Sequence, residues 1–90
     1  MKRGGVVENS TNETGNLVKD LSKQLSTLCE NNDIQMHRIL NSRDDTWCFT
    51  FWKTGVGSMK KEIDSFRFSL NPVKVYTDLI DEVCNKFELR

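Results

Sequence analysis

Three short segments of alternating side chains, separated by brief turns, constrain this fold more than any other feature of the sequence. The clearest segment is "TWCFTFWKT", residues 46–54. Every second residue of a strand points to the same face, and aromatic residues favour strands. One face of this segment therefore carries Trp47, Phe49 and Phe51, and the other carries Cys48, Thr50 and Trp52.

The two other segments lie on either side of this aromatic one. Residues 34–40 alternate as a half-buried strand, and residues 62–70 place Phe66, Phe68 and Leu70 on one face. The connections, residues 41–45 and 55–58, are rich in turn-forming residues. Parallel pairing needs a crossover of about a dozen residues, so the short connections predict a three-stranded antiparallel meander.

An amphipathic helix is predicted on each side of the meander. Asn16 can cap the first helix, and Asn71-Pro72 begins the last one, with Pro at the position where its missing N–H costs nothing. Apolar residues recur at spacings of three and four in both helices. They are Leu17, Val18, Leu21, Leu25 and Leu28 in the first, and Val73, Tyr76, Leu79, Ile80, Val83 and Phe87 in the last.

These elements predict an α+β fold, in which both helices pack on one face of the sheet. We expect the last helix to cover the face that carries Phe66 and Phe68. The opposite face stays open and keeps Trp52, together with Ile39 and Ile63.

The chain of 90 residues is predicted to form one domain, residues 16–90, after a disordered tail, residues 1–15. After the first Met, Val6 and Val7 are the sizeable apolar residues of that tail, which is too few to offset the entropy of ordering it.

The totals favour an intracellular protein, cytoplasmic or nuclear. The formal net charge is zero, so any binding to nucleic acid or membrane must come from a local patch. An odd number of cysteines without C-x-x-C spacing indicates reduced thiols: Cys29, Cys48 and Cys84. We also expect no signal peptide, because no apolar stretch follows the basic start of the chain.

Residues for catalysis or metal binding are sparse. His37 is the single histidine, and no Ser or Cys has a recognisable base partner in the sequence. One histidine and three scattered cysteines do not give the paired spacing of a structural zinc site. We therefore expect no enzyme, no catalytic residue, no metal and no cofactor.

One local charge feature stands out. Between residues 53 and 74 the sequence has only two carboxylates, Glu62 and Asp64, but five cations: Lys53, Lys60, Lys61, Arg67 and Lys74. We expect Lys60 and Lys61 to lie in a flexible loop and Lys74 to open the last helix. Together with Trp52, these residues are candidates for contacting a partner. The simpler interpretation, an ordinary solvated surface, is favoured for these cations, and an anion site for phospholipid headgroup, nucleic acid or an acidic partner is the alternative.

The closing segment, with "FRFSLNPVKVYTDLIDEVCNKFEL", resembles the kinase-associated C-terminal domain found at the ends of several protein-kinase families. Phe66-Arg67-Phe68 supplies the strand of that pattern and Tyr76 its aromatic residue. "LVKDLSKQLSTLCENNDIQMHRI" resembles its first helix and following strand. The resemblance implies a regulatory module that contacts anionic lipid or a protein surface through Lys60, Lys61, Arg67 and Lys74.

The order helix, three strands, helix also resembles the double-stranded RNA-binding domain. That resemblance implies RNA contacts from a lysine cluster at the start of the last helix, where this chain offers Lys74 followed by Asp78.

The sequence therefore predicts a small non-enzymatic interaction module that binds a protein partner in a regulatory or inhibitory role. The partner could be a second copy of the chain, and a small inhibitor encoded by a virus would show the same features. The alternative is a basic-patch binder of RNA or of anionic phospholipid headgroups.

Overall fold

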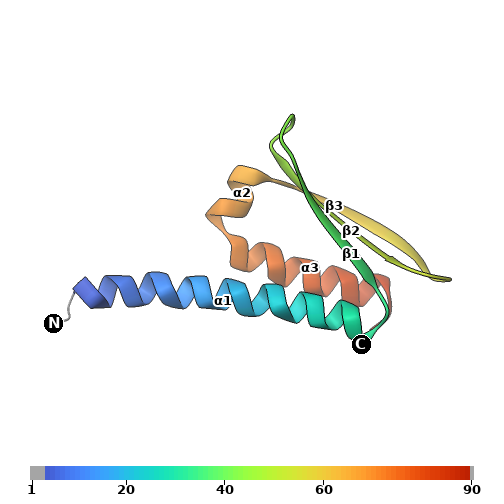
Figure 1. Ribbon diagram of the computed structural model, residues 1–90, viewed down its shortest axis with the longest axis horizontal. Helices are drawn as coiled ribbons and strands as arrows, with labels where there is room; N and C mark the ends of the chain where they lie inside the picture. Colours follow the sequence, from blue (N-terminus) through green and yellow to red (C-terminus); the bar gives the residue numbers. More distant parts are fainter. Residues whose placement is uncertain (1–3, 90) are drawn as a thin grey trace.

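The computed structural model describes the backbone of residues 4–89 and the side chains of residues 15–89. The element order is α1 (Gly4–Asn31), β1 (Gln35–Asn41), β2 (Thr46–Lys53), β3 (Gly57–Asp64), α2 (Ser65–Leu70) and α3 (Pro72–Lys86). Helices α1 and α3 run side by side on one side of the sheet, and α2 follows the end of β3 (Figure 1). This is the α+β arrangement that the sequence predicted, with one additional short helix.

Helix α1 extends N-terminal of Asn16, where the sequence predicted its start. The helix ends at Asn31, and the side chain of the following Asn32 donates a hydrogen bond to the carbonyl of Leu28 at 2.8 Å. Asp33 then adopts a φ of 58°, the left-handed conformation that ends many helices. Apart from Gly15, the predicted disordered tail lies outside the residues whose side chains are described.

The sheet is the predicted antiparallel meander, with strand order β1-β2-β3. Phe49 of β2 lies opposite Arg38 of β1 and Lys61 of β3, so these three side chains share the face toward the helices. Thr50 lies opposite His37 and Lys60 on the other face. The side-chain assignment of "TWCFTFWKT" is therefore confirmed: Phe49 and Phe51 are buried, and Trp52 is exposed.

The core lies between the helices and the sheet face carrying Phe49 and Phe51. Both rings are at most 1% exposed, as are Leu25 of α1 and Leu79 and Val83 of α3. The helical stripes were predicted correctly in their buried positions, although Leu17 remains 46% exposed. Asn71 caps α3 by accepting a hydrogen bond from the Lys74 N–H at 3.2 Å, as the Asn-Pro signal indicated.

The predicted third strand, residues 62–70, is wrong in its position. Val56 donates a backbone hydrogen bond to the Lys53 carbonyl at 3.0 Å and Gly55 has a φ of 82°, so a tight turn ends before Gly57. Strand β3 begins there and stops at Asp64. The carboxylate of Asp64 then accepts hydrogen bonds from two backbone N–H groups, and the chain continues as α2.

Because the third strand lies earlier in the chain than predicted, several side chains occupy positions other than the predicted ones. Lys60 and Lys61 lie in β3 and not in a flexible loop. Ile63, predicted on the open face, is 8% exposed and packs toward the helices. Phe66, predicted in the core, is 69% exposed, whereas Phe68 packs inward with its ring centroid 5.5 Å from that of Tyr76.

Candidate functional site

Five of the six candidate residues occupy two separate surfaces. Trp52 and Lys60 lie on the open sheet face, which we define by the outward residues His37, Ile39, Cys48, Thr50, Trp52 and Lys60. Lys61, Arg67 and Lys74 come together around a pocket between the end of β3, α2 and the start of α3. Lys53 lies at the end of β2 and belongs to neither group. The predicted single basic and aromatic patch is therefore divided between two sides of the molecule.

The open sheet face carries exposed apolar side chains on two neighbouring strands. Ile39 of β1 is 50% exposed and Trp52 of β2 is 40% exposed. Cys48 and Thr50, both half-buried, connect them along β2. His37 lies beside Thr50, so the surface combines an indole, an aliphatic side chain and several hydrogen-bonding groups. That mixture is typical of surfaces that contact proteins.

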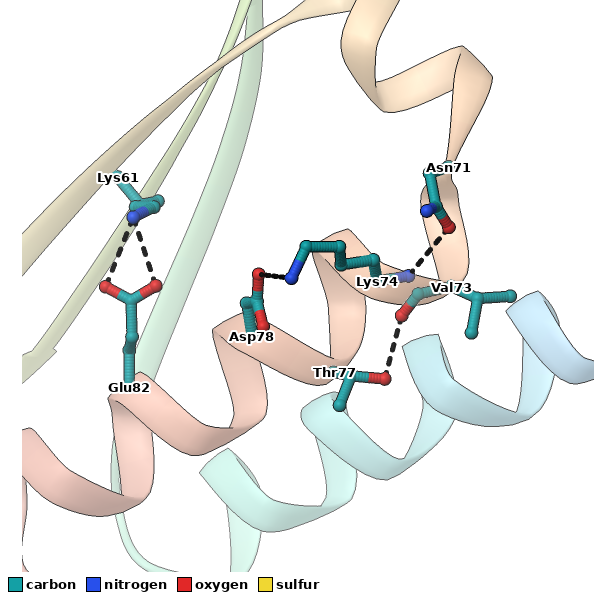
Figure 2. A network of polar contacts seen from close by, with 7 residues as sticks. All are labelled: Lys61, Asn71, Val73, Lys74, Thr77, Asp78 and Glu82. Atoms are coloured by element: carbon teal, nitrogen blue, oxygen red, sulfur yellow. Dashed lines mark hydrogen bonds and ion pairs between the residues drawn. The ribbon is translucent and has the colours of Figure 1, made fainter.

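Three of the five predicted cations are paired with carboxylates. Lys61 of β3 lies 3.1 Å from Glu82 of α3, and Lys74 lies 3.4 Å from Asp78 one turn along the same helix (Figure 2). Lys60 lies 3.6 Å from Glu62 on the open face. Counting Asp78 and Glu82, the five cations face four carboxylates, so the local excess of positive charge inferred from residues 53–74 is largely neutralised.

The pocket beside α2 has a volume of about 180 Å³. Its walls contain three cations, Lys61, Arg67 and Lys74, and three carboxylates, Glu62, Asp64 and Asp78. Figure 2 shows Lys74 reaching along α3 to Asp78, while Lys61 faces Glu82 from the sheet. This arrangement brings together three of the sequence-predicted candidates, and it is built largely from internal ion pairs.

Arg38 is a further cation on the sheet face toward the helices, and the sequence analysis did not single it out. Its Nη1 donates a hydrogen bond to the Tyr76 hydroxyl at 3.2 Å, and its guanidinium lies 5.7 Å from the centre of the Trp47 ring. An Arg over an aromatic face is attracted by the ring quadrupole. Arg38 therefore connects β1 to Tyr76 of α3 and to the Trp47 ring of β2.

The exposed side chains of α2 were also missed. Phe66 and Leu70 are each 69% exposed, more than any other large apolar residue in the described part of the chain. The sequence signal was Asp64-Ser65, an Asp in the position that accepts hydrogen bonds from the first helical N–H groups: Phe66 at 2.7 Å and Arg67 at 3.2 Å. The alternation of Phe66, Phe68 and Leu70 concealed it.

Two observations on the described side chains concern a cysteine thiol and metal-binding groups. Burial, together with the neighbouring Cys84, raises the pKa of the Cys29 thiol from 9.0 to about 11, so it stays protonated at neutral pH. Residues 15–89 contain no group of three or more His, Cys, Asp or Glu side chains that could hold a metal ion.

No family model, curated protein or solved structure matches this chain. Among the described helices, none combines the length and the apolar character needed to cross a bilayer.

Proposed function

We propose that this chain is a small non-enzymatic module that binds a protein partner through the open sheet face around Trp52. The observation that carries the proposal is the exposure of Trp52 and Ile39 on the sheet face opposite α1 and α3. Both side chains lie on this face, four register positions apart, and Trp is enriched among residues that dominate binding energy.

The ion pairs support a protein partner over RNA or anionic lipid. Binding to phosphates is driven by cations that are free to displace counterions. Here Lys60, Lys61 and Lys74 already face carboxylates within 3.6 Å. A phosphate-rich surface would approach Glu62, Asp78 and Glu82 at the same time as these cations, and that repulsion offsets much of the attraction.

Affinity capture from a lysate of the source cells, treated with nuclease, tests this function. The bait is the full chain, compared with Trp52→Ala, Ile39→Ala and the control Leu17→Ala. Leu17 is 46% exposed and belongs to α1, which lies on the other side of the sheet from the open face (Figure 1). We expect one set of proteins retained by the chain and by Leu17→Ala, and lost from both open-face variants.

Two results would contradict the proposal. One is a set of bound proteins that Trp52→Ala and Ile39→Ala retain unchanged. The other is binding that disappears after nuclease treatment or falls steeply between low and high salt, which would favour the nucleic-acid alternative. Light scattering of the purified chain shows separately whether a second copy is the partner.

A further inference from the structure

The outward side of α2 is a second exposed surface, and it has a distinct composition. Residues three and four apart lie on the same side of a helix, so Phe66, Arg67 and Leu70 share one side. We call these three residues the α2 face. Phe68 points the other way, with its ring centroid 6.0 Å from that of Phe49 in the core. The short helix is thus anchored by Phe68, while two large apolar side chains and a cation remain exposed.

Arg67 differs from the other cations of the adjoining pocket because its guanidinium makes no ion pair or hydrogen bond with any described residue. Lys61 is paired with Glu82, and Lys74 with Asp78. The carboxylates of the pocket are also engaged: Glu62 with Lys60, and Asp64 with the backbone N–H groups of α2. Among the described residues, Arg67 is therefore the cation of this pocket without an ion pair, and it lies between Phe66 and Leu70.

We infer that the α2 face, with the pocket beside it, binds an acidic amphipathic segment of a protein partner. A carboxylate of the partner pairs with Arg67, and apolar side chains on either side of that carboxylate cover Phe66 and Leu70. A guanidinium presents a planar fork of donors that matches a carboxylate in two-pronged geometry. This inference rests on the proposed protein-binding function and adds a second surface with a stated partner chemistry.

The size and charge of the site favour a peptide segment over a membrane or RNA. The pocket has a volume of about 180 Å³, so it offers room for a side chain of a partner. Arg67 is a single unpaired guanidinium in this pocket, so it suits a single carboxylate of a partner. A surface carrying many phosphates would need several unpaired cations and would also meet the carboxylates of Glu62, Asp64 and Asp78.

The test is a selection of displayed random peptides against the full chain, followed by affinity measurements on the purified variants Arg67→Glu, Phe66→Ala and Leu70→Ala. Val56→Ala is the control, and a denaturation midpoint shows that each variant is folded. We expect selected peptides that combine Asp or Glu with Leu or Phe at helical spacing. Their affinity should fall about tenfold or more in each α2-face variant and stay unchanged in the control.

A charge exchange makes the assignment to Arg67 specific. Replacing the acidic residue of a selected peptide by Lys should abolish its binding to the unmodified chain and restore binding to Arg67→Glu. Selected peptides without acidic residues, or peptides that bind Arg67→Glu as well as the unmodified chain, would overturn the inference. Binding of phosphatidylserine-containing vesicles or of an RNA duplex that depends on Phe66 and Arg67 would overturn it in favour of those ligands.

The same affinity measurements, with Trp52→Ala added to the variants, distinguish this inference from the proposed function. Peptides that lose affinity for Trp52→Ala but not for Arg67→Glu would overturn the role of the α2 face and leave protein binding by the open sheet face intact. An absence of any selected peptide, combined with captured proteins that ignore both surfaces, would overturn both proposals.

Discussion

The ring of Phe68 meets the ring of Tyr76 edge-on, with centroids 5.5 Å apart and planes at 85°. This contact joins α2 to α3, and through Phe49 it joins both to the sheet. Because Phe68 points inward, its neighbours Phe66 and Leu70 are held outward. The exposure of the α2 face is therefore a consequence of how the core is packed.

Phe68 and Phe66 form a matched pair of the same residue type on one helix. Phe68→Ala removes three ring contacts and should lower the free energy of unfolding by about 2–3 kcal/mol, below the range for a fully buried Phe because the side chain is half-buried. Phe66→Ala should change it by about 0.5 kcal/mol or less. Urea denaturation of both variants checks this, and equal losses would contradict the assigned orientation of α2.

Asp64 marks the boundary that separates β3 from α2. Asp64→Ala removes the acceptor for the N–H groups of Phe66 and Arg67 and should destabilise the chain by about 1 kcal/mol. Asp64→Asn keeps a side-chain oxygen and should retain most of that stability. Thermal unfolding distinguishes the two, and an Ala variant as stable as the Asn variant would exclude a capping role.

Lys61 and Glu82 connect the sheet to α3 across a half-exposed gap. Their side chains are 41% and 39% exposed, so the pair should contribute about 0.2–1 kcal/mol. A double-mutant cycle with Lys61→Ala and Glu82→Ala measures that coupling directly. We expect the coupling to shrink in high salt. A coupling above about 2 kcal/mol would indicate a pair shielded from water.

We expect the raised pKa of the Cys29 thiol to lower the stability of the chain at alkaline pH. Burial raises its pKa from 9.0 to about 11, so in the folded chain the thiol keeps its proton in a range where the unfolded chain loses it. The stabilising difference is fully present below pH 9 and is lost as pH rises toward about 11, by up to about 2–3 kcal/mol. Denaturation midpoints of the chain and of Cys29→Ala across this range check it. Parallel decline in both would contradict the assignment.

The accessibility of the three cysteines to a thiol reagent provides an independent test of the fold. Cys29 and Cys84 are buried, whereas Cys48 is half-buried on the open sheet face. A thiol reagent applied to the native protein should label Cys48 first and the other two at rates limited by unfolding. Mass spectrometry of partly labelled protein identifies the order, and early labelling of Cys29 would contradict the packing of α1.

Local signals in the sequence were sufficient for most of the fold. Asn71-Pro72 located the start of α3, and the alternation around Phe49 assigned both sheet faces in β2. The alternation of Phe66, Phe68 and Leu70 was misleading because residues 66 and 70 also satisfy the spacing of a helix. Burial of Phe68 decides between the two patterns, and burial depends on residues far away in the chain.

The ion pairing of the candidate site was harder to predict from the sequence, because one of its pairs joins residues that are far apart in the chain. Lys61 and Glu82 are twenty-one positions apart, so their pairing depends on how β3 and α3 pack. Counting charges only between residues 53 and 74 omitted Glu82 and Asp78, and it overstated the basic character of the surface. Trp52 was located correctly because strand alternation is a local property.

Photo-crosslinking from the open sheet face tests the proposed function most directly. A benzoylphenylalanine is placed at position 52 in one chain and at position 17, on α1, in a control chain, and both are irradiated in nuclease-treated lysate. We predict defined protein adducts from position 52 that are absent from position 17. A chain that gives no protein adduct from position 52, or the same adducts from both positions, would contradict a protein-binding role for this face.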